Sequence, residues 1–367
     1  MDRDSKMKVV GQGRDSKMKV RHILTLVTIV AVALIMAMYL SHSQTEEAKL
    51  KVIYAGSLIV PFEEMESQFE ELHPGVDVQV EGHGSIQAIR YVTDIHKEYD
   101  VVAVADDSLI PDMMYPEYAD WYVRFATNQV VLAYTNSSKY AEEINESNWY
   151  EVLARPGVKF GFSNPMLDAC GYRTLTLIQL AELYYGNQTI FDDLIMRNFD
   201  PKIQVTEDGG TYTVIVPDVF EPQGDKISVR GGSLQLLALL DYAGIDYAFE
   251  YKSVAQQHDL RYLELPAQID LSSPEYGDIY GKVTVMLGFQ RFASVGVERI
   301  GIPIFYGFTI PKNAPNQELA LEFVKFVLSE GGQSILRDKY QPLVTPAVDN
   351  LDKLPPELRD VVVQEIK

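Results

Sequence analysis

The feature that most constrains this chain is a unit of strand, small-residue turn and helix that occurs twice in succession. Residues 50–55, Leu-Lys-Val-Ile-Tyr-Ala, are typical of a strand and are followed by Gly56-Ser57, and apolar side chains then recur every three or four positions. Residues 76–80 alternate like a strand, and the segment 82–85, Gly-His-Gly-Ser, opens a second helical stretch. Such units predict an α/β fold built on parallel strands.

Small polar residues follow these strands at the point where each one ends. Ser57 follows the first strand and Ser85 the second, while a third apolar run, residues 100–104, ends in Asp106-Asp107. In open α/β sheets, ligands bind outside the carboxyl ends of the strands. Each serine alone is more typical of a helix cap or turn. Two of them at equivalent places favour a site where hydroxyl and N–H groups hold an anion.

The length of 367 residues exceeds what one hydrophobic core usually organises, so we expect two lobes. A second α/β block begins near residue 129, and a less regular stretch, 186–232, contains a hairpin around residues 207–216. An amphipathic helix at 317–329 is expected to pack back on the first lobe. The predicted division is lobe 1 at 49–128 and 300–350, lobe 2 at 129–299 and a C-terminal tail at 351–367.

The N-terminal region is predicted to be a targeting element. Residues 23–40 form an apolar run, preceded by a basic segment, 1–22, that contains a short duplication, and followed by a polar linker, 41–48. A helix of that length spans ~27 Å. This length is on the border between that of a cleaved signal peptide and that of an uncleaved membrane anchor. We therefore expect the rest of the chain outside the cytoplasm, at the outer face of the cell membrane.

Composition excludes several functions. The formal net charge of -20 makes nucleic-acid binding improbable, because phosphates would be repelled. Cys170 is the single cysteine, so neither an intramolecular disulfide nor a cysteine zinc cluster can form. The six histidines show no ligand spacing, and no nucleophile elbow, P-loop or dinucleotide motif is present. The sequence therefore predicts a binding protein and no enzyme.

Two acidic residues occupy turns next to predicted helices. Asp168 lies in a turn-forming segment that leads into a helix, where an aspartate most often acts as a cap stabilised by the helix dipole. Glu250 follows the predicted strand 245–249 and is also placed as a first-turn carboxylate. Their structural role and a ligand-binding role both remain open from the residues alone.

Four segments in order carry a resemblance to a known family: residues 55–58 (Ala-Gly-Ser-Leu), 103–111, 163–173 and 249–255. Together they resemble the archaeal-type tungstate/molybdate-binding proteins of ABC importers, from about residue 50 to about residue 347. The resemblance implies a type II periplasmic-binding-protein fold, with two α/β lobes and the ligand in the cleft between them. It also implies an ABC permease as partner, a monomer, and no cofactor besides the transported oxyanion.

The resemblance further implies a set of binding residues. Ser57 and Ser85 would donate to anion oxygens from one lobe, and backbone groups of the turn formed by Met166, Leu167 and Asp168 would do so from the other. Asp168 and Glu250 would bind the tungsten or molybdenum atom directly, and Tyr276 is the expected tyrosine contact. Hard carboxylate oxygens suit a high-valent metal centre, whereas sulfate and phosphate do not readily accept such ligands.

Alternatives of two kinds remain. A receptor of the same fold could take a ferric ion through Asp168, Glu250 and Tyr251, or could take sulfate or phosphate. An extracytoplasmic hydrolase would instead use Asp168 and Glu250 as an acid/base pair.

Overall fold

The computed structural model describes residues 22, 25–34, 36, 47–288, 298–362 and 364–366. It consists of two units, Met1–Ala48 and Lys49–Lys367. Of the expected apolar segment 23–40, residues 25–34 and 36 are helical and exposed, and the remainder lies outside the described residues, as do the basic segment except for His22 and most of the linker. In the part of the chain that is described, no helix has both the length and the apolar character needed to span a bilayer.

Lobe 1 is our name for the seven-stranded sheet of the second unit, with strand order β16-β15-β4-β14-β3-β1-β2, and its helices. Its strands are β1 (Ala48–Ala55), β2 (Val76–His83), β3 (Val101–Val104), β4 (Val123–Thr127), β14 (Phe305–Thr309), β15 (Leu343–Val348) and β16 (Gln364–Glu365). β1 and β3 are parallel, whereas β14 is antiparallel to both β3 and β4. Two residues of the expected C-terminal tail thus form an edge strand, parallel to β15.

The helices of lobe 1 cover this sheet because their apolar residues fall on one side. They are α2 (Ile59–Leu72), α3 (Ser85–Thr93), α4 (Leu109–Met114), α11 (Gln317–Leu328) and α12 (Glu330–Asp338). The ring of Phe323 on α11 lies 6.2 Å from that of Phe62 and 5.2 Å from that of Phe69, both on α2. The expected return of this C-terminal helix to the first lobe is confirmed.

Lobe 2 contains a five-stranded sheet, β11-β5-β10-β6-β9, and a four-stranded sheet, β13-β12-β8-β7. The first consists of β5 (Val130–Tyr134), β6 (Phe160–Ser163), β9 (Ile227–Arg230), β10 (Tyr247–Tyr251) and β11 (Arg261–Glu264). The second consists of β7 (Gln204–Asp208), β8 (Thr211–Ile215), β12 (Val283–Met286) and β13 (Glu298–Ile300). β7 and β8 pair antiparallel across Gly209 and Gly210, which is the hairpin that the sequence predicts.

The helices of lobe 2 are mostly short. They are α5 (Trp149–Ala154), α6 (Ala169–Tyr185), α7 (Ile190–Leu194), α8 (Gln235–Asp241), α9 (Lys252–Gln257) and α10 (Gly277–Tyr280). The exception, α6, is buried on all sides over its first thirteen residues. This helix therefore lies in the interior of the lobe, although its buried residues include the charged Arg173.

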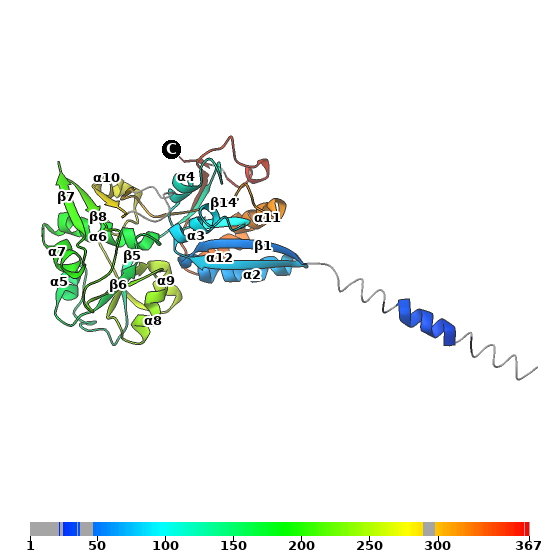
Figure 1. Ribbon diagram of the computed structural model, residues 1–367, viewed down its shortest axis with the longest axis horizontal. Helices are drawn as coiled ribbons and strands as arrows, with labels where there is room; N and C mark the ends of the chain where they lie inside the picture. The colour runs from blue at the N-terminus through cyan, green and yellow to red at the C-terminus, as the bar shows by residue number, and fades with distance from the viewer. Residues whose placement is uncertain are drawn as a thin grey trace, which may run out of the picture. The chain divides into compact units, whose positions relative to one another are not determined.

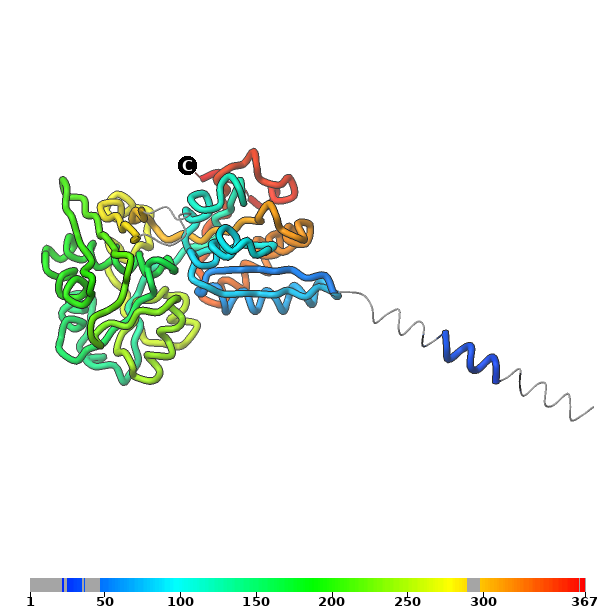
Figure 2. Tube along the Cα trace, viewed as in Figure 1, coloured from blue at the N-terminus to red at the C-terminus, as the bar shows by residue number. Residues whose placement is uncertain are grey.

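The chain passes between the two lobes twice, from β4 to β5 and from β13 to β14. Figure 1 shows the two lobes side by side, with β5, β6, α8 and α9 in one and β1, α2 and α11 in the other. The tube in Figure 2 shows that the orange and red C-terminal segments lie with the blue and cyan ones. Ligand-binding groups from both lobes can therefore meet where the lobes touch.

Candidate functional site

The two serines of lobe 1 are buried at the ends of β1 and β2. Ser57 lies in the 3-10 turn η1 (Gly56–Leu58), and its Oγ is 2.8 Å from the hydroxyl of Tyr306 on β14. Ser85 is the first residue of α3, and its Oγ accepts the N–H of Ala105 at 3.1 Å. Because that bond uses the oxygen as an acceptor, the Ser85 hydroxyl proton is available to a ligand. The sequence predicts both positions correctly.

Asp168 is the N-cap of α6, as its sequence context favours. Its Oδ1 accepts the N–H of Cys170 at 2.9 Å and its Oδ2 accepts the N–H of Ser233 at 3.2 Å. Burial raises the pKa of this carboxyl to about 6, and the two N–H donors oppose the rise. The carboxylate is thus fixed from two directions.

Glu250 lies inside β10, paired with Val131 of β5, so its expected place in the first turn of a helix is wrong. The side chain is fully buried, and one oxygen, Oε1, accepts the N–H of Tyr251 at 2.8 Å. The other, Oε2, has no hydrogen-bond partner among the described residues. Burial raises the pKa of Glu250 to about 8; Asp168 adds to the rise, and hydrogen bonding to Tyr251 and Ser233 opposes it. A buried carboxylate oxygen without a partner is costly, and this is typical of ligand-binding positions.

The turn before α6 makes direct contact with lobe 1. The Leu167 carbonyl accepts the N–H of Gln87, on α3, at 3.1 Å. A Cβ placed on Gly84 would lie 2.4 Å from this carbonyl oxygen and 3.0 Å from the Cβ of Asp168. Only glycine permits this approach, which brings Asp168 next to Ser85.

The backbone N–H groups of this turn are not free for an anion in this arrangement. Met166 donates to Oδ1 of Asn164 at 2.9 Å, and Leu167 and Asp168 donate to the Asn164 carbonyl at 3.0 and 2.9 Å. Donation from the main chain of Met166, Leu167 and Asp168 to a bound anion stays a prediction. The carboxylate of Asp168 remains the group that this segment presents.

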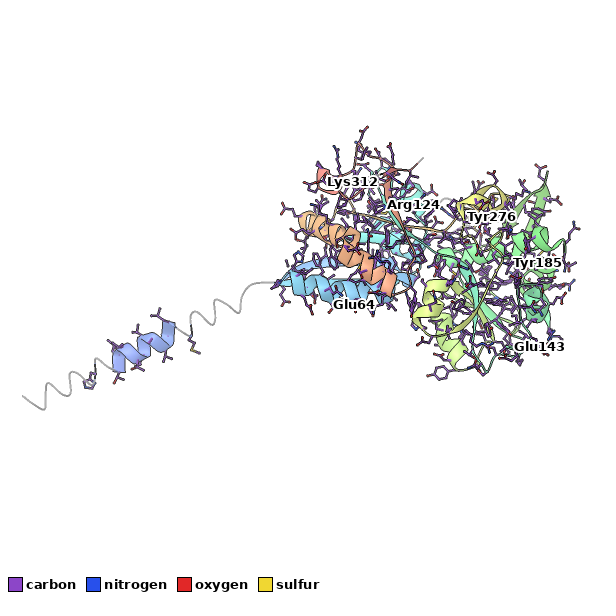
Figure 3. All side chains as sticks on the ribbon, turned by 180° about the vertical axis from the view of Figure 1, so that it is seen from behind. Glu64, Arg124, Glu143, Tyr185, Tyr276 and Lys312 are labelled. Carbon is purple, nitrogen blue, oxygen red and sulfur yellow. The ribbon has the colours of Figure 1, made fainter. Side chains whose placement is uncertain are left out.

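Tyr276, labelled in Figure 3, ends the 3-10 turn η3 (Pro274–Tyr276) beside α10. Its ring centroid is 6.5 Å from that of Tyr280. In the region that the structure describes, no hydrogen bond joins it to Ser57, Ser85 or either carboxylate.

A buried ion pair between the lobes was not predicted from the sequence. Asp106, after β3, accepts a hydrogen bond from the Tyr172 hydroxyl and lies 3.4 Å from Nη2 of Arg173, both on α6. Nη1 of Arg173 donates to the Ala105 carbonyl and, at 2.8 Å, to the Tyr251 hydroxyl. Although burial opposes it, the charge of Arg173 holds the pKa of Asp106 below its usual value. The resemblance covers both segments, but nothing in either one indicates their pairing.

Comparison with protein families identifies the family to which the chain belongs. The model of the bacterial extracellular solute-binding proteins matches residues 50–340. The chain belongs to this family. The family places it outside the cytoplasm, and the resemblance inferred from four short segments is borne out.

One relative is the molybdate/tungstate-binding protein WtpA of Pyrococcus abyssi. It is 44% identical over 327 residues, which cover 87% of this chain and 91% of the relative. That identity extends over both lobes, so the relative shares the whole architecture and not a single motif.

Solved structures confirm the type II periplasmic-binding-protein fold. The periplasmic molybdate-binding protein of Azotobacter vinelandii matches with a TM-score of 0.52 at 15% identity, covering 80% of this chain and 99% of that one. The sulfate-binding protein SubI of Mycobacterium tuberculosis gives the same TM-score at 12% identity, covering 80% and 87%. At sequence identities this low, the structural similarity establishes only the fold. The ligand therefore has to be inferred from the residues of the site.

Proposed function

We propose that this protein captures a tungstate- or molybdate-type oxyanion outside the cytoplasm and delivers it to an ABC permease. The relative from Pyrococcus abyssi carries molybdate and tungstate in its name, which supports this ligand class. The observation that carries the proposal is a pair of buried, electrostatically coupled carboxylates, Asp168 and Glu250, of which Asp168 lies against Gly84, the residue before Ser85 in the other lobe.

The two carboxylates suit a heavy-atom oxyanion better than sulfate or phosphate. Serine hydroxyls at Ser57 and Ser85 supply donors for oxo groups, while Oε2 of Glu250, once the carboxyl is ionised, is an acceptor without a donor. A ligand that presents only acceptor oxygens leaves this atom unsatisfied, whereas tungsten or molybdenum accepts it as an additional ligand. Discrimination then follows from the cost of the unpaired oxygen.

A ferric ion finds weaker support at this site. Tyr251 would have to bind it as the phenolate, yet burial raises its pKa well above the ordinary value, and its hydroxyl accepts from Arg173. Among the described residues, no group of three or more histidine, cysteine, aspartate or glutamate side chains is arranged to hold a metal ion. The oxyanion therefore remains the proposal.

The proposal includes the setting in which the protein acts. The family supports a binding protein, and we propose that it acts without catalysis, as a monomer, with no cofactor besides the transported oxyanion. We also propose that residues 23–40 serve as signal peptide or anchor, and that residues 49–128 and 300–350 form lobe 1 and residues 129–299 form lobe 2, with the tail adding β16 to the sheet of lobe 1.

Calorimetric titration of the purified protein tests which anion it binds. We expect one tungstate or molybdate per chain, undisturbed by excess sulfate, and at least a tenfold loss of affinity in Asp168→Asn and in Glu250→Gln. Glu357→Gln, which changes an exposed glutamate, is the matched control. Sulfate binding of equal strength in the wild type and both site variants would refute the proposal, as would tight ferric binding without a tungstate response.

A further inference from the structure

The hydroxyl of Ser57 lies against a tyrosine on another strand of lobe 1. Ser57 Oγ is 2.8 Å from Oη of Tyr306, on β14, and both residues are buried. Burial raises the pKa of Tyr306 above its ordinary value, so this hydroxyl keeps its proton. Each of the two hydroxyls therefore carries a proton, and only one of these protons can lie between the two oxygens.

An asparagine determines which proton that is. Nδ2 of Asn128 donates to Oη of Tyr306 at 3.1 Å and to Oγ of Ser253 at 2.8 Å. The orientation of this amide is fixed, because its Oδ1 accepts the main-chain N–H of Gln129 at 3.0 Å and that of Ser253 at 3.4 Å. Since Oη of Tyr306 accepts from Asn128, Ser57 is the one remaining partner of this hydroxyl among the described residues. A buried hydroxyl proton without an acceptor is costly, so Tyr306 donates to Ser57.

This direction of donation leaves the proton of Ser57 available to a ligand. In the part of the chain that the structure describes, Oγ of Ser57 makes no hydrogen bond besides the one to Tyr306. It accepts from Tyr306 in the same way as Oγ of Ser85 accepts from the N–H of Ala105. Both serines of lobe 1 can thus donate outward, as the oxo groups of an anion require.

The residues that orient Ser57 lie where the chain crosses between the lobes. Asn128 stands between β4 of lobe 1 and β5 of lobe 2, and Tyr306 is the second residue of β14, the first strand after the return crossing. Ser253, the other acceptor of the Asn128 amide, belongs to α9 of lobe 2. The direction of the Ser57 hydroxyl therefore depends on a contact to which both lobes contribute.

We propose that Tyr306 is a positioning residue for oxyanion capture: oriented by Asn128, it donates to Ser57 and so directs the Ser57 hydroxyl proton to the ligand. The identity of the ligand rests on the proposed function, whereas the direction of these hydrogen bonds does not. Tyr306 acts through Ser57 and does not itself bind the oxyanion.

Calorimetric titration with tungstate tests this role in variants that keep the shape of the side chain. Tyr306→Phe removes the donor to Ser57 and should weaken binding about fivefold, which corresponds to one hydrogen bond. In the Ser57→Ala background the same change should alter the affinity by less than about twofold. Tyr115→Phe, which removes a hydroxyl that hydrogen-bonds Asp349 in the same lobe, is the matched control and should bind like the wild type. Unchanged affinity in Tyr306→Phe, or an equal loss in the Ser57→Ala background, would overturn the inference.

Asn128→Asp reverses the direction of donation and separates it from a purely structural role. An ionised carboxylate only accepts, so the Tyr306 proton turns to it and the Ser57 proton turns to Tyr306, away from the ligand. We expect at least about a tenfold loss of affinity, more than in Tyr306→Phe, although the side chain keeps its size. The added negative charge acts on the anion in any background, so the loss caused by Asn128→Asp should be smaller, but not absent, in Tyr306→Phe. Equal losses in the two backgrounds would show an effect of charge alone and would refute the role of Tyr306.

Neutron diffraction from crystals of the ligand-free protein, exchanged into heavy water, gives a readout without tungstate. The deuterium on Oη of Tyr306 should lie toward Oγ of Ser57, and that of Ser57 should point away from Tyr306. If this arrangement is found and the wild type binds neither tungstate nor molybdate, the proposed function fails and the orienting role of Tyr306 stands. A Ser57 deuterium that lies toward Oη of Tyr306 contradicts that role whatever the ligand.

Discussion

Replacing Gly84 by alanine should weaken ligand binding by acting on the contact between the lobes. The added Cβ would lie 2.4 Å from the Leu167 carbonyl oxygen, where a carbon and an oxygen normally approach to about 3.3 Å. The two segments must separate by roughly 0.9 Å, which stretches the hydrogen bond from Gln87 to Leu167 beyond its normal range. We expect about 1 kcal/mol for that bond and about 1–3 kcal/mol for overpacking.

The sum, about 2–4 kcal/mol, corresponds to a roughly 30- to 700-fold weaker affinity if binding requires the closed cleft. Alanine fits the backbone of Gly84, whose φ is -62° and ψ 145°, so the variant is not strained by itself. Any loss of N-cap preference at α3 acts on the open and closed forms alike and does not change binding.

Calorimetric titration with tungstate measures the affinity, and small-angle scattering measures closure. Gly277→Ala is the matched control, because a Cβ at Gly277 meets nothing within 4 Å and its φ is -52°. Wild-type affinity in Gly84→Ala, with thermal stability unchanged, would refute the argument that this contact forms part of the bound state.

Three further outcomes are expected. Burial raises the pKa of Glu250 to about 8, so the stability that this group contributes is present below pH 4.5 and is lost as the pH rises toward 8. The unfolding temperature of the ligand-free protein should therefore fall over that range, and Glu250→Gln should make this fall smaller. An unchanged slope in Glu250→Gln would contradict the assignment. Arg173→Met leaves Asp106 buried without its cation, which should cost ~3 kcal/mol or more in thermal unfolding experiments; a near-neutral effect would show that the pair is dispensable. Tyr276→Phe should bind tungstate within twofold of the wild type, and a tenfold loss would place its hydroxyl at the ligand.

The sequence predicted those parts of the site that depend on local pattern. Ser57 and Ser85 follow strands, and Asp168 precedes a helix, so strand ends and capping preferences locate all three. The family resemblance added Glu250, although its local context suggested the wrong element: Glu250 pairs with Val131 in a sheet, and that partner lies more than a hundred positions away in the chain.

What the sequence left out depends on contacts between distant segments. Ser233 reaches Asp168 across 65 positions, and Arg173 reaches Ala105 across 68. Hydrophobic periodicity and turn preference describe neighbours in the chain and carry no information on such pairs. The hydrogen bonds that the N–H groups after Asn164 make within their own turn were also not predicted, because the resemblance concerns only the ligand-bound state.

The selectivity of this site among oxyanions depends on Oε2 of Glu250, the carboxyl oxygen without a hydrogen-bond partner among the described residues. A tetrahedral oxyanion of any kind can accept hydrogen bonds from serine hydroxyls such as those of Ser57 and Ser85. With sulfate, Oε2 of Glu250 would then face acceptor oxygens without a donor, at a cost of at least about 1–3 kcal/mol. With tungstate or molybdate, the same oxygen becomes a metal ligand, and the cost is replaced by a bond. The unpartnered oxygen of Glu250 thus discriminates against common anions when the carboxyl is ionised, because only a metal centre can then use it as a ligand.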